Sequence, residues 1–211
     1  MSYFNRTILP VLVLFISTQF LFADPPDWED NPGAYEFTAT IVGGQVLSDG
    51  VPFAAADDLF AAFDGDGNVR GIASQQIPIG GPYSGEIVYE MTMRSNAAGD
   101  LLSFKYYDAS EDEVLNIAET YEFVINDQIG TLITPIEYNL AFVTLSFSNF
   151  TTSSIDILYD SNVDIYDFHF NFSGVTQTSV TPGILGWFIC DNNTGFCNYN
   201  FIGGPPLPAG S

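Results

Sequence analysis

The chain has very few basic residues. Four lysines and arginines stand against 26 aspartates and glutamates, which gives a formal net charge of −22 at pH 7. Nucleic-acid phosphates and anionic lipid headgroups bind to clusters of lysine and arginine, and the sequence contains no such cluster. The composition therefore excludes nucleic acid as a partner. It is compatible with divalent cations, neutral glycans and salty media.

The residues that most enzymes use for catalysis are also scarce. His169 is the only histidine, and neither a Gly-x-Ser-x-Gly nor a His-Glu-x-x-His motif occurs. Asp167 and Asn171 share a strand face with His169, so a hydrogen-bonded polar face is the simplest interpretation. Glu86 and Glu90 are four residues apart on one strand face, too far for a retaining glycosidase pair. The sequence therefore predicts no enzyme, and a glycan-cleaving activity is the least favoured reading.

Long apolar runs are absent after the first 23 residues. The leader has Arg6, then an apolar stretch over Ile8–Phe22, and the small residue Ala23 precedes an acidic, proline-rich segment. This pattern predicts a cleaved signal peptide over 1–23, and removal of Arg6 takes the charge from −22 to −23. An uncleaved anchor helix is the alternative, but the run is short for a span of ~20 residues. We expect an extracellular or cell-surface protein without membrane insertion after cleavage.

Cys190 and Cys197 are the only cysteines, and six residues separate them. In an oxidising compartment this spacing, with Asp191 to Gly195 between the two, predicts a disulfide that closes a hairpin tip. A metal site is the alternative, but it needs two further ligands, and no histidine lies nearby.

Short segments with a hydrophobic period of two run through the whole chain and predict an all-β protein of half-buried antiparallel strands. Glycine- and aspartate-rich turn signals separate them. The acidic stretch Ala109–Glu119 is the one helix-like candidate, and it suits a loop or a single turn equally well. The expected strands lie at residues 35–41, 86–93, 102–106, 121–125, 141–147, 154–159 and 165–172.

A break in the pattern near Pro135–Leu140 predicts a domain boundary. We expect two Ig-like or jelly-roll-like β-sandwich domains in tandem, over residues 24–138 and 139–211. The second contains only about four or five strands, whereas a sandwich of this type usually has about seven. The second domain is therefore expected to be incomplete at its C-terminal end.

The stretch Ile155–Val175 resembles the opening strands of cohesin-like modules. It contains a short strand, the turn Tyr159-Asp160-Ser161 and then an aromatic strand, although Asp167 stands where the modules usually have glycine. The segments Asp58–Gly65, Val69–Ala73 and Leu102–Asp108 resemble a β-sandwich repeat that accompanies these modules in large secreted surface proteins of marine bacteria. The resemblance implies an adhesive surface module related in fold to carbohydrate-binding domains.

A possible calcium loop is the sharpest local motif. In Asp64-Gly65-Asp66-Gly67-Asn68, oxygen ligands alternate, so Asp64, Asp66 and Asn68 can point into one concavity. The EF-hand pattern fails, because Val69 and Gln75 occupy the required glycine and glutamate positions. A plain hairpin turn is the alternative. Further ligands from neighbouring loops would be Asp57, Asp58, Asp108, Glu111, Asp112 and Glu113.

Aromatic residues offer platforms on which sugar rings can stack. The candidates are Trp28, Trp187 and the tyrosines Tyr83, Tyr107 and Tyr199, with Trp28 also able to pin the entry segment to the sandwich edge. We therefore expect a non-catalytic extracellular module for binding or adhesion, with a glycan or another protein as its partner. The alternative function is a structural building block of a surface assembly with no small ligand.

Overall fold

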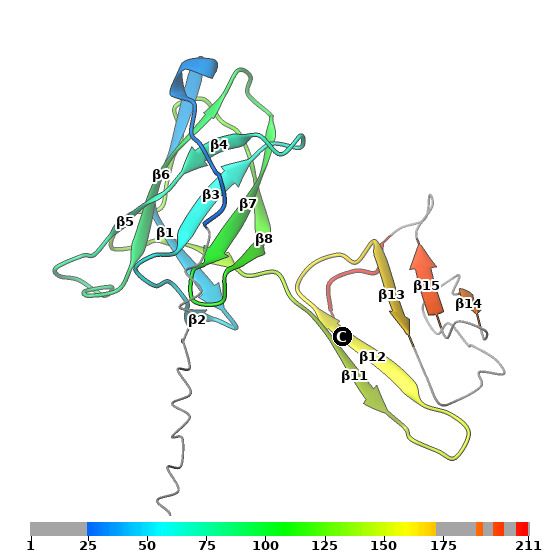
Figure 1. Ribbon diagram of the computed structural model, residues 1–211. Helices are drawn as coiled ribbons and strands as arrows, with labels where there is room; N and C mark the ends of the chain where they lie inside the picture. Colours follow the sequence, from blue (N-terminus) through cyan, green and yellow to red (C-terminus); the bar gives the residue numbers. More distant parts are fainter. Residues whose placement is uncertain (1–24, 172–188, 192–195, 201–205, 211) are drawn as a thin grey trace, which may run out of the picture.

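The computed structural model describes residues 25–171, 189–191, 196–200 and 206–210 (Figure 1). Apart from one short 3₁₀ turn, η1 (Pro32–Ala34), the regular elements in these ranges are all strands. The prediction of an all-β fold with antiparallel sheets is therefore confirmed. Within the same ranges, no helix is long and apolar enough to cross a membrane.

Two sheets form a sandwich from the first part of the described chain. The first sheet has the order β10-β1-β6-β5, with two further short strands, β2 and β9, also paired to β1. Its strands are β1 (Phe37–Ser48), β2 (Val51–Pro52), β5 (Ser74–Gln76), β6 (Val88–Ser95), β9 (Gln128–Ile129) and β10 (Ile136–Asn139). The pairings of β1 with β9 and β10 are parallel, and the others are antiparallel.

The second sheet is entirely antiparallel and has the order β4-β3-β7-β8. Its strands are β3 (Leu59–Phe63), β4 (Val69–Ile72), β7 (Leu101–Asp108) and β8 (Glu113–Glu122). Gly71 in β4 lies so close to the first sheet that a Cβ there would stand 2.5 Å from the carbonyl oxygen of Thr92 in β6. The two sheets therefore nearly touch along this edge.

An aromatic core joins the two sheets. The ring centroid of Phe60 in β3 lies 5.4 Å from that of Tyr89 in β6 and 5.0 Å from that of Tyr138 in β10, and Phe104 in β7 lies 4.9 Å from Tyr138. Most of the inward-facing residues that alternation predicts in β1, β6 and β7 are at most 1% exposed, whereas Phe37 is half-buried and Val88, expected on the outer face, is 0% exposed. The inward-facing residues that are at most 1% exposed are Ala39, Ile41, Tyr89, Met91, Met93, Leu102, Phe104 and Tyr106.

The prediction for residues 109–119 was wrong. Most of this stretch belongs to β8, which pairs with β7 from Asp108–Glu113 to Leu101–Glu122. Ile117 contributes to the core, and Leu115 packs against it. Glu111 and Asp112 lie in the tight turn and Glu113 begins the strand. Their charge suggested a loop, but the apolar residues that follow form a strand at the edge of the sheet.

The later part of the chain has separate small sheets. One contains β11 (Val143–Ser148) and β12 (Asp156–Ser161), and the other has the order β13-β15-β14. These three strands are β13 (Asp167–Asn171), β14 (Ile189–Asp191) and β15 (Phe196–Asn200). Since β10 pairs with β1 and β11 pairs with β12, the partnership changes between residues 139 and 143. The division into domains 24–138 and 139–211, and the incompleteness of the second, stay predictions.

Candidate functional site

The turn between β3 and β4 brings the predicted calcium ligands Asp64 and Asn68 together, but their oxygens and amides bind one another. The carboxylate of Asp64 accepts hydrogen bonds from the backbone amides of Asp66 (3.0 Å) and Asn68 (2.8 Å) and from the Asn68 side chain (2.9 Å). Asp66 itself is exposed. The segment is thus a hairpin turn organised around one aspartate.

The positively charged guanidinium group of Arg70 lies at this turn. The Nε of Arg70 is 2.9 Å from Oδ2 of Asp64, and its Nη2 is 4.0 Å from Oδ2 of Asp100 at the start of β7. Burial alone would raise the pKa of Asp64, but the hydrogen bonds from Asn68 and the contact with Arg70 outweigh it and lower this pKa from 3.8 to about 2. A calcium ion that bound Asp64 would therefore compete with a guanidinium group.

The acidic residues expected to complete the calcium site lie elsewhere. Asp58 precedes β3 and Asp64 follows it, so the two carboxylates stand at opposite ends of one strand. Asp108 and the turn after it lie at the Asp58 end, because Leu59 pairs with Tyr107. Among the described residues, no group of three or more histidines, cysteines, aspartates and glutamates is placed to hold a metal ion. Calcium binding stays a prediction that rests on the turn alone.

Asp58 is a buried carboxylate, 4% exposed, that fastens three segments of the sandwich. Its oxygens accept hydrogen bonds from the backbone amides of Ala55 (2.7 Å) and Ala109 (2.9 Å) and from the hydroxyl of Tyr106. Burial, followed by the hydrogen bond to Asp58, raises the pKa of Tyr106 well above its usual value. Because each Asp58 oxygen is engaged by donors of the protein, the residue is a structural anchor.

The entry segment before β1 lies against the sandwich. The ring of Trp28 meets Phe63 at the end of β3 edge-on, with 5.2 Å between centroids, and Nζ of Lys105 lies 5.2 Å from the centroid of the same Phe63 ring. This contact confirms that Trp28 pins the segment to the sandwich. It covers part of the indole, which had been a candidate sugar platform, and leaves Trp28 half-buried.

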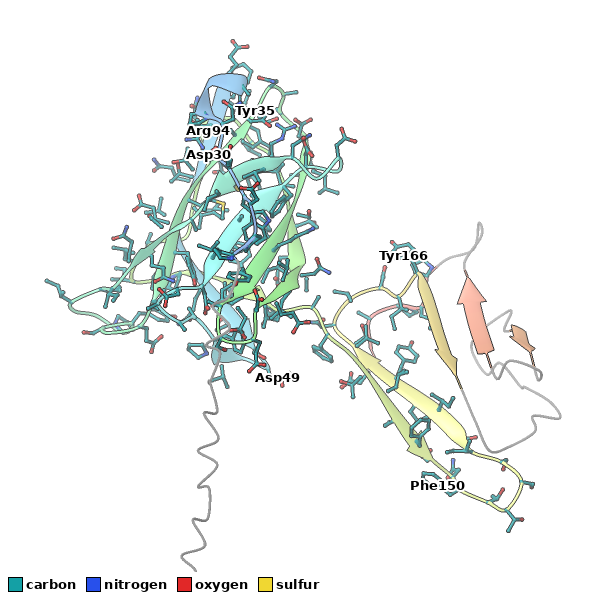
Figure 2. All side chains as sticks on the ribbon, in the orientation of Figure 1. Asp30, Tyr35, Asp49, Arg94, Phe150 and Tyr166 are labelled. Atoms are coloured by element: carbon teal, nitrogen blue, oxygen red, sulfur yellow. The ribbon has the colours of Figure 1, made fainter. Side chains whose placement is uncertain are left out.

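Two further contacts hold the same segment, and Figure 2 shows Asp30, Tyr35 and Arg94 together at one end of the sandwich. Nη1 of Arg94 in β6 is 2.5 Å from Oδ2 of Asp30, and the guanidinium of Arg70 lies 4.4 Å from the ring centroid of Tyr35. Arg70, Arg94 and Lys105 are all the cationic residues after the predicted leader. Each of them therefore has an acidic or aromatic partner within the sandwich or its entry segment.

The remaining predicted residues are placed only in part. Tyr107, expected to be exposed, is 2% exposed, and its hydroxyl donates to Oδ1 of Asp112 in the turn that covers it. The backbone register sets Cys190 opposite Cys197 in the β14–β15 hairpin and His169 in the middle of β13. The side chains of these three residues and of Tyr199, as well as Trp187 and the leader 1–23, lie outside what the structure describes.

Sequence reasoning missed a cluster of exposed isoleucines and a leucine at one end of the sandwich, which we call the apolar loop cluster. In the loop between β5 and β6, Ile77 is 63% exposed and Ile79 fully exposed, and in the loop between β9 and β10, Ile133 is 62% exposed. A Cβ on Gly81 would lie 3.4 Å from Cγ2 of Ile133, so the two loops touch. We include in this cluster Leu132 of the same loop and Ile136 at the start of β10, which are 38% and 40% exposed. The non-alternating sequence Ile77-Pro78-Ile79-Gly80-Gly81 was the available signal.

A shallow recess of about 290 Å³ lies where β11 follows β10, with Asp49, Glu119 and Asn162 in its lining. The carboxylate of Glu119 accepts hydrogen bonds from the backbone (2.7 Å) and side-chain (2.8 Å) amides of Asn139. Asn162 accepts from the Phe142 amide and donates to the Leu140 carbonyl, both at 2.8 Å. These hydrogen bonds hold the segment between β10 and β11 in place.

No protein-family model, curated protein sequence or solved structure matches this chain.

Proposed function

We propose that the protein is a non-catalytic, exported binding module that contacts a partner protein through the apolar loop cluster. The observation that carries this function is the exposure of Ile77, Ile79 and Ile133 on two touching loops of an otherwise acidic chain. Contiguous apolar groups on a protein surface mark interaction sites, because water is released when a partner covers them.

The charge of the chain limits the partner. With a net charge of −22, the surface around the cluster repels acidic proteins and attracts a partner with lysine and arginine around an apolar centre. A protein partner suits the structure better than a glycan, because Tyr107 is buried and Trp28 is half-buried against Phe63. Both were candidates for stacking on sugar rings.

Export and the disulfide belong to the same proposal. The pattern of residues 1–23 supports a cleaved leader, and the register of Cys190 opposite Cys197 supports a cross-strand bond, since paired residues of antiparallel strands have Cα atoms about 4.5–5.5 Å apart. Alkylation of the two thiols only after reduction would agree with this, and alkylation without reduction would contradict it. The resemblance of residues 155–175 to cohesin-like modules also supports a surface location.

The test compares three versions of the full chain on arrays of extracellular proteins and of glycans. The double variant Ile79→Ser/Ile133→Ser removes the most exposed apolar side chain of each loop. Leu101→Ser is the matched control, because Leu101 is 61% exposed at the start of β7. We expect a protein ligand that binds the wild type and the control and loses at least about tenfold in affinity with the double variant. Silence on both arrays, or glycan binding that survives the double substitution, would overturn the proposal.

A further inference from the structure

A second apolar surface, independent of the loop cluster, lies on the hairpin of β11 and β12. The register pairs Leu145 with Tyr159 and Phe147 with Ile157, so these side chains share one face with Val143. We call this the apolar hairpin face. Val143, Leu145, Phe147 and Ile157 are 50%, 46%, 58% and 40% exposed.

The face carries no charged residue, although the chain as a whole has a net charge of −22. The hairpin's strand carboxylates, Asp156 and Asp160, pair with Ser148 and Thr144 and therefore lie on the opposite face. Two copies of the apolar hairpin face can meet without bringing carboxylates together. The same symmetric contact through most other described surfaces of the chain would place acidic groups opposite one another.

The area suits a weak dimer. At the hairpin tip, outside the paired strands, Phe150 and Ile155 are also 72% and 46% exposed, and Figure 2 shows Phe150 there. The four side chains that the contact buries are each about half exposed. Two copies therefore bury less than the ~1,200 Å² of a standard interface, so the contact belongs with weak, transient associations. A two-stranded sheet also gains stability when another layer covers its apolar face.

We infer that a second copy of this chain covers the apolar hairpin face in a symmetric, face-to-face contact. The contact buries Val143, Leu145, Phe147 and Ile157 of both copies. Because the copies repel each other through their net charge, added salt screens the repulsion and strengthens association. An interface built from ion pairs would respond to salt in the opposite direction.

Sedimentation velocity of the full chain, from low micromolar to sub-millimolar concentration and at two salt concentrations, tests this. Leu145→Asp places a charge on the face, and Leu158→Asp is the matched control, because Leu158 is 50% exposed and lies on the opposite face of the same hairpin. We expect a dimer that strengthens with salt, weakens at least about tenfold in Leu145→Asp and changes less than about twofold in the control.

Phe147→Thr is a second variant in case the aspartate variant misfolds, because threonine has a high strand propensity and removes most of the apolar area. It should weaken the dimer without changing the circular dichroism spectrum. A wild type that stays monomeric at every concentration and salt overturns the inference. If that monomer loses thermal stability with Leu145→Asp and not with Leu158→Asp, residues of the same chain cover the face. A monomer that binds a different protein through this face would also overturn it.

Discussion

Replacing Asp58 by alanine should be the most damaging single polar substitution in the sandwich. The change removes the acceptor of three hydrogen bonds, from the Ala55 amide, the Ala109 amide and the Tyr106 hydroxyl. Ala55 is exposed, so water can replace the lost acceptor there. Tyr106 is 0% exposed and Ala109 is half-buried, and each orphaned buried donor costs about 1–3 kcal/mol. The expected loss is about 3–4 kcal/mol, a large part of a total stability of about 5–15 kcal/mol.

Urea unfolding followed by circular dichroism measures this loss, provided that the slope of the free energy with urea is unchanged. Asp66→Ala is the control, because Asp66 is an exposed aspartate and its loss should stay within about 0.5 kcal/mol. Adding Tyr106→Phe to Asp58→Ala removes one orphaned hydroxyl, so the double variant should recover about 1–2 kcal/mol relative to additivity. A loss below about 1 kcal/mol for Asp58→Ala would refute the anchoring role.

Three further predictions concern the turn and the entry segment. The lowered pKa of Asp64 means that its ionised form stabilises the fold above pH 3.8 and that this contribution disappears as the pH falls through about 2. The stability difference between wild type and Asp64→Asn, measured by urea unfolding, should therefore narrow between pH 4 and pH 2, and a constant difference would argue against it. Millimolar calcium should raise the melting temperature more in Arg70→Gln than in the wild type, since the guanidinium competes for Asp64. Equal rises in melting temperature would show that the guanidinium does not compete with calcium. Trp28→Ala should cost about 1–2 kcal/mol and speed proteolysis of the entry segment, because the edge-on contact with Phe63 is lost; unchanged cleavage would count against this contact.

The strands were predictable where one face is apolar and the other polar. Met91 and Met93 in β6 alternate with Glu90 and Thr92, and the methionines are buried as the pattern predicts. The strand β8 was harder to predict, because it begins with the acidic residue Glu113 and only one of its residues, Ile117, is buried. Sequence reasoning could not give the pairing of β1 with β10, since no local signal connects them.

For the turn Asp64–Asn68, the sequence predicted which residues lie together but not which groups bind the carboxylate of Asp64. The side chains of Asp64 and Asn68 do meet, as their spacing indicates, but through the amide nitrogen of Asn68 and not through its oxygen. The spacing could not show that Arg70, six residues after Asp64, reaches back to the same carboxylate. Nor could it show that Asp58 is buried, because an aspartate at the start of a strand usually faces water.

Because β10 pairs in parallel with β1, the first sheet of the sandwich is incomplete until the chain reaches residues 136–139. Gly44 is paired with Ile136, and the antiparallel partner of β1 on its other side is β6. A chain that ends before residue 136 leaves the central strand with an open edge and without Tyr138, which packs against both Phe60 and Phe104. Contacts this distant in sequence slow folding, because a long loop must close before they form. A fragment over residues 25–125 should therefore remain unfolded alone and gain structure when a peptide that spans β9 and β10 is added.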